Sequence, residues 1–343
     1  MINLALMGAG RIGKMHAENI LIHPETTLAG VYDISLQSSK DLAIKCNCYR
    51  FENVDSIFLS DQVDAIIVAS STSTHADYIE KAVKNNKPVL CEKPIDLDLR
   101  RINQTAEKIK NSTVQVQIGF NRRFDPGHQA SREALLEGRI GNLYQVIITS
   151  RDPEMPPKTY YENAGGLFRD MTIHDFDLAR FMLNDEPVAV FAMAEGLIDP
   201  NMMKGLSDHD TAMIFLTTKD GKQCCINNSR SAVYGYDQRV ELLGSNGMIQ
   251  SNNKKPHEMR IFDKNSTETS EPYEYFFLER YSESFMGEIS EFVKSVREGV
   301  STKVGFEDGR KALVLAEAAY LSLNESRLVK VSEITDKYNI EIS

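Results

Sequence analysis

Short apolar runs alternate with helical patterns over the first 120 residues of the chain. Most of the apolar runs are nearly continuous, which is typical of strands that are covered on both faces. They predict strands at 2–7, 27–32, 65–69, 88–91 and 114–118, with a weaker one near 48–51. The helical patterns lie at 12–22, 38–45, 74–85 and 99–110. This succession predicts parallel βαβ units that form a doubly wound sheet.

After residue 120 the pattern changes. Strand patterns there mostly follow one another without helical patterns between them, and several are separated by turn signals such as Asp220-Gly221 and Asn246-Gly247. Strands are predicted at 143–150, 188–195, 210–218, 222–229, 239–243 and 247–250. Two helices at 284–298 and 306–323 close the chain. We therefore predict two domains, 1–120 and 121–343, which also agrees with the size at which single cores stop growing.

An unusual helical pattern runs from 165 to 183, "GGLFRDMTIHDFDLARFML", and opens with a flexible glycine pair. A helix places one apolar stripe along it, and His174 falls on that stripe, on the face expected to be buried. Asp170 lies one turn earlier, and Asp177 follows the same edge. A buried imidazole needs a partner. From this segment alone, His174 is either a core histidine satisfied by a carboxylate or a general base oriented by Asp170. The stripe consists of Leu167, Met171, His174, Leu178, Phe181 and Met182.

The turn after the first predicted strand carries a glycine fingerprint, GxGxxG, in the order Gly8, Ala9, Gly10, Arg11, Ile12, Gly13. Such glycines let the backbone approach a pyrophosphate, which then lies at the positive end of the next helix. Asp33 ends the second strand 20 residues after Gly13, the spacing of an acid that bonds an adenosine ribose. An acid there repels a 2′-phosphate, so the sequence predicts NAD rather than NADP.

Two further strands end in polar residues, and ligands of doubly wound sheets lie at such carboxyl ends. The first segment runs from Ala69 to His75, and Ser73 or Thr74 in it has an alternative role as a helix N-cap. The second is Cys91-Glu92-Lys93-Pro94. A cation at Lys93 polarises a substrate oxygen and stabilises an alkoxide that develops beside nicotinamide.

Composition excludes several classes of function. The formal charge of −10 argues against nucleic acid or an anionic membrane surface as the main partner. We find no signal peptide and no apolar run of the roughly 20 residues that span a bilayer. The odd number of cysteines, without CxxC spacing, predicts reduced thiols in a cytoplasmic protein, and no cluster has the spacing of a metal site. The five are Cys46, Cys48, Cys91, Cys224 and Cys225.

Taken together, "GAGRIG", "CEKPIDLDL" and "GGLFRDMTIHDFDLARFML" resemble the glucose-fructose oxidoreductase / inositol dehydrogenase / rhizopine catabolism (Gfo/Idh/MocA) family over essentially the whole chain. Within the family, "GFNRRFDPGHQ" (119–129) and "ITSRDPEMPP" (148–157) most resemble inositol 2-dehydrogenases. The resemblance implies an α/β fold: a Rossmann domain followed by an α/β domain with a large, open, mostly antiparallel sheet. It also implies a homo-oligomer, commonly a tetramer, and often a cis peptide before Pro94.

The resemblance places the family's catalytic lysine, aspartate and histidine on Lys93, Asp170 and His174. The implied reaction is oxidation of myo-inositol by hydride transfer to NAD, with His174 as base, Asp170 orienting it, and Lys93 holding the same oxygen. The expected substrate pocket adds Arg123, Arg151 and Tyr236, with Asp152 and Asp177 as weaker candidates. The expected cofactor contacts are Gly8, Ala9, Gly10, Arg11, Ile12, Gly13, Asp33, Ser70, Ser71, Thr72, His75, Glu92 and Lys93.

Two alternatives stay open. The first is a dehydrogenase of another cyclic polyol or an aldose, such as scyllo-inositol, which needs the same three residues. The second is a non-catalytic, NAD-binding regulator, which has no need of an aspartate-oriented histidine beside a lysine. The sequence does not choose between a site role and a subunit-contact role for Arg280 and Tyr281, and it predicts His128 and His209 as surface or loop residues.

Overall fold

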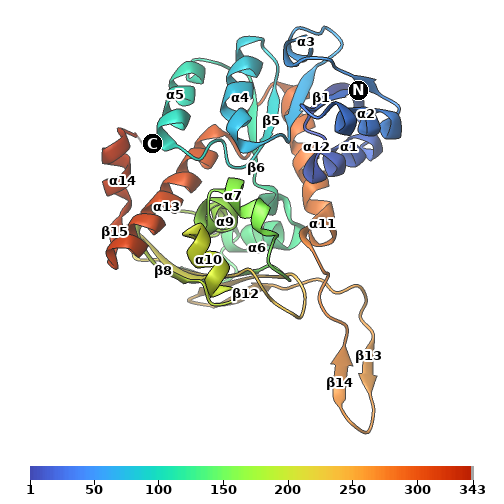
Figure 1. Cartoon of the computed structure of the whole chain (residues 1–343). Helices are drawn as coiled ribbons and strands as arrows, with labels where there is room; N and C mark the ends of the chain where they lie inside the picture. Colours follow the sequence, from blue (N-terminus) through green and yellow to red (C-terminus); the bar gives the residue numbers. More distant parts are fainter. Residues whose placement is uncertain (341–343) are drawn as a thin grey trace. The chain divides into compact units, whose positions relative to one another are not determined.

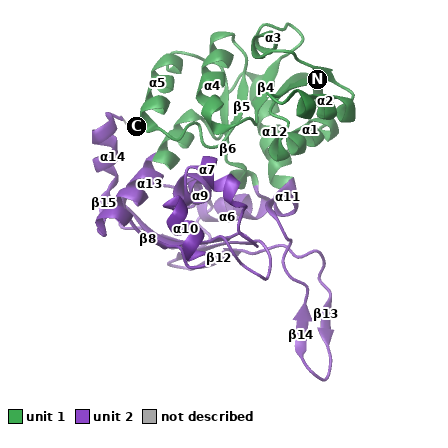
Figure 2. Ribbon diagram, viewed as in Figure 1, with its two compact units in different colours: residues 1–124, 283–313 green, residues 125–282, 314–343 purple. Residues whose placement is uncertain are grey.

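The computed structural model describes residues 1–340 and divides into two compact units (Figures 1 and 2). Unit 1 contains residues 1–124 and 283–313, and unit 2 contains residues 125–282 and the chain from 314 onward. The predicted division at 120/121 placed residues 283–313 in the second domain, whereas they pack within unit 1. The family fold that the sequence predicts, a Rossmann domain and a second α/β domain with a mostly antiparallel sheet, is confirmed.

Unit 1 is built on a six-stranded parallel sheet in the order β3-β2-β1-β4-β5-β6. This order is that of a dinucleotide-binding doubly wound sheet, whose strand order reverses between β1 and β4. The strands are β1 (Ile2–Met7), β2 (Thr26–Tyr32), β3 (Tyr49–Arg50), β4 (Ala65–Val68), β5 (Val89–Glu92) and β6 (Val116–Gly119). The four residues of β4 are all buried, which explains its continuous apolar run.

The α-helices of unit 1 within residues 1–124 agree closely with the predicted ranges, with one exception. They are α1 (Arg11–Ile22), α2 (Leu36–Cys46), α3 (Val54–Phe58), α4 (His75–Lys84) and α5 (Leu99–Ile109). The helix α3 was not predicted, because it has only five residues and is too short to show a period. It is nevertheless capped, because the Asn53 side chain accepts a hydrogen bond from the Ser56 N–H.

One helix of unit 1 comes from the far end of the sequence. The helix α12 (Ser282–Glu298) packs on the sheet beside α1 and α2. Its Ile289, Phe292 and Val293 join the same core cluster as Leu4 of β1 and Ile67 of β4. The N-terminal sheet is thus completed by a segment that lies almost 300 residues from its first strand.

Unit 2 contains a seven-stranded sheet in the order β12-β11-β7-β10-β9-β8-β15. Its strands pair antiparallel, apart from the parallel pair β7 and β10. The strands are β7 (Leu143–Arg151), β8 (Pro187–Glu195), β9 (Thr211–Thr218), β10 (Gln223–Ser229), β11 (Asp237–Gly244), β12 (Gly247–Ser251) and β15 (Val329–Lys330). A separate hairpin, β13 (Arg260–Phe262) and β14 (Thr267–Ser270), extends from the unit (Figure 1).

Side chains alternate across the large sheet, and the two faces differ. On β9, Ala212, Ile214 and Leu216 are buried, whereas Met213 and Phe215 are exposed. The remaining helical elements of the chain are the 3₁₀ turns η1 (Thr72–Thr74) and η2 (Asn121–Phe124), and the α-helices α6 (Pro126–Leu136), α7 (Lys158–Ala164), α8 (Leu167–Asp170), α9 (Thr172–Leu183), α10 (Pro200–Leu206), α11 (Phe277–Arg280), α13 (Phe306–Glu325) and α14 (Val331–Tyr338).

The predicted single helix over 165–183 is wrong in two respects. It is divided at Met171 into α8 and α9, and α9 is buried almost all round instead of along one stripe. His174 is partly exposed, although the stripe placed it on the buried face. Asp175 and Asp177 are instead buried, at 0% and 1% exposure. The physical reason is that a nearly enveloped helix has no polar face, so its periodicity does not report which side meets solvent.

No helix within residues 1–340 combines the length and the apolar character that crossing a lipid bilayer requires.

Candidate functional site

The glycine turn between β1 and α1 has the geometry of a pyrophosphate cradle. Gly8 has φ +111°, and a Cβ built there would lie 2.3 Å from the Ala69 carbonyl oxygen. A Cβ at Gly13 would lie 2.0 Å from the Gly8 carbonyl oxygen, so this glycine permits the helix to pack on the strand. A Cβ at Gly10 would meet nothing within 4 Å. The protein itself therefore leaves open the space at Gly10, at the start of α1, where a phosphate group would approach.

Asp33 connects the end of β2 to this turn. Its Oδ2 accepts a hydrogen bond from the Ala9 N–H at 2.6 Å, and its Oδ1 accepts one from the Ser35 N–H at 2.7 Å. Each carboxylate oxygen has a second lone-pair site, so Asp33 can still accept a ribose hydroxyl. The arrangement fits an adenine dinucleotide, with Arg11 exposed and Ile12 partly exposed beside Gly10.

Gly10 and Gly13 give a matched test of the pyrophosphate cradle. We expect Gly10→Ala to raise the KM for NAD by at least about tenfold and to leave the thermal midpoint unchanged, because the added methyl meets ligand but no protein atom. Gly13→Ala should instead lower the midpoint by several degrees, because its methyl overlaps the Gly8 carbonyl. Steady-state kinetics and thermal unfolding measure both effects. Equal losses of stability in the two variants would contradict the assignment of Gly10 as the position where the phosphate approaches.

The segment after β4 does not form the predicted N-cap. Thr74 occupies the N-cap position of α4 without a side-chain cap bond, and the preceding residues form η1. The Thr74 hydroxyl donates to the Ser71 carbonyl oxygen at 2.7 Å, and the Ser70 and Thr74 hydroxyls lie 2.7 Å apart. Ser71 is exposed and Thr72 is partly exposed, so both remain accessible for a cofactor contact.

His75 connects the ends of two strands. It is 1% exposed, and its Nδ1 lies 2.8 Å from the Pro94 carbonyl oxygen while its Nε2 lies 3.0 Å from that of Ser70. Burial lowers the pKa of His75, and a neutral ring has one N–H to donate to one of these oxygens. Both ring nitrogens thus face backbone carbonyl oxygens of unit 1, and the cofactor contact expected of His75 stays a prediction.

The segment after β5 carries Lys93, which is partly exposed. The Lys93–Pro94 peptide bond is cis, as the family resemblance implies. The preceding Glu92 accepts a hydrogen bond from His16 Nε2 at 2.7 Å. On either side of Lys93, His75 thus holds the backbone of Pro94 and His16 holds the side chain of Glu92.

In unit 2, Asp170 ends α8 and is 7% exposed. Its Oδ2 accepts a hydrogen bond from Arg230 Nη2 at 2.6 Å, and its Oδ1 accepts one from the Tyr160 hydroxyl at 2.8 Å. Arg230 Nη1 also donates to Asp152 Oδ2 at 3.0 Å. Burial opposes the charge of Arg230, but Asp170 and Asp152 more than offset this and raise the pKa of Arg230. Asp170 is thus paired with a permanent cation.

Sequence reasoning missed Arg230 and Tyr160. Arg230 directly follows β10, and Tyr160 lies in the short helix α7. One signal was available in the sequence: Arg230 comes directly after a strand with alternating side chains, and residues at strand ends often line a functional site and do not pack in the core. Its pairing with Asp170 had no local signal, because the two are 60 positions apart.

The start of α9, which carries His174, is anchored to the sheet. Asn228 of β10 donates from Nδ2 to Asp175 Oδ2 at 2.9 Å. Its Oδ1 accepts a hydrogen bond from the Thr172 hydroxyl at 2.6 Å. These bonds use buried side chains on either side of His174, so they fix the rotation of the helix that carries it.

The predicted substrate residues fall in both units. Arg123 lies in η2 of unit 1, where its Nη2 pairs with Asp308 Oδ1 at 2.9 Å. Arg151 ends β7 of unit 2, and its Nη1 donates to the Tyr234 hydroxyl at 2.7 Å. Tyr236, also in unit 2, is 5% exposed, and its ring lies edge-on to Tyr281.

Asp177 and Arg180 form one of the buried ion pairs of unit 2, at 3.4 Å. Arg280 and Tyr281 are each 2% exposed, and Arg280 Nη1 donates to Asp125 Oδ2 at 2.5 Å. The prediction that His128 lies at the surface is wrong, because its side chain is buried in α6. Its ring packs beside Tyr281 in a cluster that one-dimensional patterns do not reveal.

Comparisons with known proteins identify the fold family. Residues 2–120 match the model of the Gfo/Idh/MocA oxidoreductase family with its NAD-binding Rossmann fold, and residues 128–250 match the Gfo/Idh/MocA C-terminal domain. The chain is 40% identical to the inositol 2-dehydrogenase of Rhizobium meliloti over 331 residues. This matched region covers 96% of this chain and 99% of that protein.

Solved structures show the same similarity. A myo-inositol dehydrogenase from Corynebacterium glutamicum is 40% identical and superposes with a TM-score of 0.93, covering 96% of this chain and 98% of its own. A scyllo-inositol dehydrogenase from Lactobacillus casei, with bound NAD(H) and scyllo-inositol, is 26% identical with a TM-score of 0.90, covering 97% and 99%. The chain described here therefore belongs to the Gfo/Idh/MocA family of oxidoreductases.

Proposed function

We propose that this protein is an NAD-dependent inositol 2-dehydrogenase, which oxidises myo-inositol to 2-keto-myo-inositol. The observation that carries this proposal is the 40% identity to an inositol 2-dehydrogenase over 96% of the chain. The open position at Gly10 and the placement of Asp33 support it independently, because they form a site suited to a dinucleotide without a 2′-phosphate.

The cofactor would be held by the turn from Gly8 to Gly13, by Asp33, and by the polar ends of β4 and β5. Bound NAD would supply the nicotinamide carbon that accepts the hydride from the carbinol carbon. The protein's own residues have to place the alcohol, remove its proton and stabilise the charge that develops on its oxygen.

We assign His174 as the base that takes the hydroxyl proton at an imidazole nitrogen. Asp170 supports the imidazolium, and Arg230 and Tyr160 hold the Asp170 carboxylate in place. Lys93 stabilises the same alcohol oxygen. Arg123, Arg151 and Tyr236 complete the proposed substrate contacts, since a neutral polyol requires many donors and acceptors instead of one sign of charge.

A panel of polyols tests this assignment. We expect NADH formation, followed by absorbance, to proceed with myo-inositol at a kcat/KM at least about tenfold above that with scyllo-inositol or glucose. Replacing NAD with NADP should lower kcat/KM further, because the Asp33 carboxylate repels a 2′-phosphate. Preference for an aldose would overturn the substrate assignment and leave the oxidoreductase assignment intact.

The similarity to the scyllo-inositol dehydrogenase favours a second candidate, a dehydrogenase of that epimer. Both candidates use the same chemistry at Lys93 and His174, so the panel separates them. A non-catalytic, NAD-binding regulator would bind cofactor without forming NADH from any polyol, and that result would favour the regulator.

We further propose that the protein is a cytoplasmic homotetramer. The exposed side of the large sheet presents Met193, Met213 and Phe215, which are 61%, 45% and 47% exposed. Rows of exposed apolar side chains on a sheet favour association of copies. Replacing Met213 and Phe215 with lysine should give a smaller species in sedimentation. The five free cysteines support a reducing compartment.

A further inference from the structure

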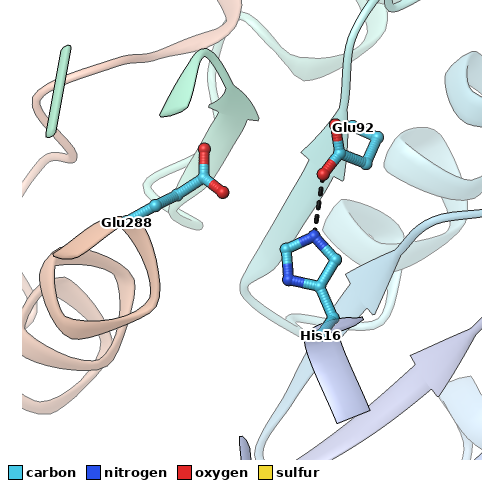
Figure 3. A group of neighbouring side chains, drawn as sticks. All are labelled: His16, Glu92 and Glu288. Carbon is cyan, nitrogen blue, oxygen red and sulfur yellow. Dashed lines mark hydrogen bonds and ion pairs between the residues drawn. The ribbon is translucent and has the colours of Figure 1, made fainter. Parts of the chain in front are cut away.

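A buried acidic cluster lies inside unit 1, near the end of β5. It consists of His16 of α1, Glu92 of β5 and Glu288 of α12, and Figure 3 shows Glu288 extending from its helix toward the other two. One ligating atom from each residue lies within 4.8 Å of those of the other two. His16 and Glu288 are both 0% exposed. The Glu92 side chain is 13% exposed, so two carboxylates approach each other where water screens them poorly.

The polar atoms of this cluster are incompletely satisfied by the described residues. His16 Nε2 donates to Glu92 Oε1 at 2.7 Å, but His16 Nδ1 and both carboxylate oxygens of Glu288 have no hydrogen-bond partner among residues 1–340. Gln117 of β6 donates to the backbone oxygen of Glu288 and not to its carboxylate. A buried, ionised and unpaired carboxylate is too costly to persist, so Glu288 requires either a proton or a cation.

The geometry favours the proton. Two atoms that coordinate one metal ion do not hydrogen-bond each other, whereas His16 and Glu92 are directly bonded. The neighbouring elements are α1, β5 and β6, which present His16, Glu92 and the neutral Gln117. Burial, followed by the charge of Glu92, raises the pKa of Glu288 well above its ordinary value.

We propose that Glu288 is a neutral carboxylic acid and a positioning residue, whose proton allows it to share a buried site with Glu92 and thereby to fix the segment from which Lys93 emerges. The stability part of this inference stands alone, and the kinetic part rests on the proposed function of Lys93. The Glu288 side chain extends toward Glu92, the last residue of β5, whose carboxylate is bonded to His16 (Figure 3). An ionised Glu288 would repel Glu92 and loosen that strand end.

The sign of the pH dependence follows from this assignment. Glu288 is ionised in the unfolded chain above about pH 4.3 and neutral in the folded chain, so folding takes up a proton. Its contribution to stability is complete below the unfolded pKa and is lost as pH rises toward the folded pKa. Glutamine has nearly the same shape and never ionises, so E288Q removes this loss.

The first experiment measures unfolding of the full chain in denaturant by circular dichroism, from pH 5 to pH 8. We expect the folding equilibrium constant of E288Q, divided by that of the wild type, to rise about tenfold per pH unit while Glu288 stays neutral in the folded state. The control is E298Q on the same helix, where Glu298 is exposed, and its ratio should be flat. A flat ratio for E288Q would overturn the proposal.

The second experiment tests positioning through the kinetics. E288A should lower kcat with the best polyol by about tenfold, whereas E288Q should restore it and retain more activity than the wild type at alkaline pH. A merely structural role would lower the thermal midpoint of E288A without changing the pH profile between E288Q and wild type. An E288Q variant as impaired as E288A would show that the charged form is needed and would overturn the proposal.

A third measurement separates a proton from a metal. Mass spectrometry of the dialysed protein should find no stoichiometric divalent metal, and a bound metal that is lost in E288Q would overturn the proposal. These outcomes differ from failure of the proposed function. If the wild type oxidises no polyol, the Lys93 assignment fails, while the denaturation and metal assays still report on Glu288.

Discussion

Alanine at His174 is expected to lower kcat for the best polyol by about 10²- to 10⁴-fold, because the variant has no base to take the hydroxyl proton. Lys93→Ala should lower kcat by about 10²- to 10³-fold, because the charge developing on the alcohol oxygen loses its stabilising cation. NAD affinity, measured by fluorescence titration of NADH, should change little in H174A, since the glycine turn and Asp33 bind the cofactor in our proposal.

The matched control for the histidine variant is His257→Ala, since His257 is exposed in the segment between β12 and β13. It should retain wild-type kcat and KM. Full activity of both H174A and K93A would show that these residues do not perform the chemistry, whatever the substrate. Loss of NADH binding in H174A would indicate instead that the helix α9 had lost its structure.

Arg230→Met should destabilise the protein by about 3–5 kcal/mol and also lower kcat. The variant leaves Asp170 buried without its cation, and an uncompensated buried charge is far more costly than the loss of an exposed ion pair. The Asp170 side chain is 8% exposed and that of Arg230 is 5% exposed, so solvent screens neither. Denaturant unfolding measures the loss, and steady-state kinetics measures the effect on turnover.

A double-mutant cycle separates the interaction between Asp170 and Arg230 from the other contacts of these two residues. Asp170→Asn combined with Arg230→Met should be more stable than Arg230→Met alone, because the asparagine carries no charge to be left unpaired. Activity should stay low in the double variant, since the asparagine does not support an imidazolium at His174. As a control, Arg260→Met removes an exposed pair with Glu268 and should change stability by less than about 1 kcal/mol. An equally small effect for R230M would contradict our view of Asp170.

The sequence determined the strands and helices of unit 1 well, because each is specified by neighbouring residues. The predicted strand at 2–7 coincides with β1, and the other long elements differ by one or two residues. The glycine turn was also readable, because its fingerprint lies in one short stretch. The requirement for Gly13 is local, since a Cβ there would meet the Gly8 carbonyl, whereas Gly8 has no room for a Cβ because Ala69, at the end of β4, occupies the space. Lys93, Asp170 and His174 were identified through motifs of fixed spacing.

The tertiary structure decided which residues surround those motifs. Arg230 meets Asp170 from 60 positions away. The helix α9, which follows Asp170, is bonded to β10 through Asn228, and no short-range pattern encodes that packing. The prediction that His174 lies on a buried face was wrong, because an enveloped helix loses the contrast between its faces that periodicity measures.

Chain connectivity also hid part of unit 1. The helix α12 is amphipathic in sequence, but nothing along the chain states that it returns to cover the first sheet or that it brings Glu288 to the cluster of His16 and Glu92. Local physical chemistry therefore determined most elements of unit 1 and the dinucleotide turn of this protein, and the family resemblance supplied the proposed reactive residues. Only folding decided the partners that hold those residues, because partners are selected by proximity in space, and proximity depends on the packing of the whole chain.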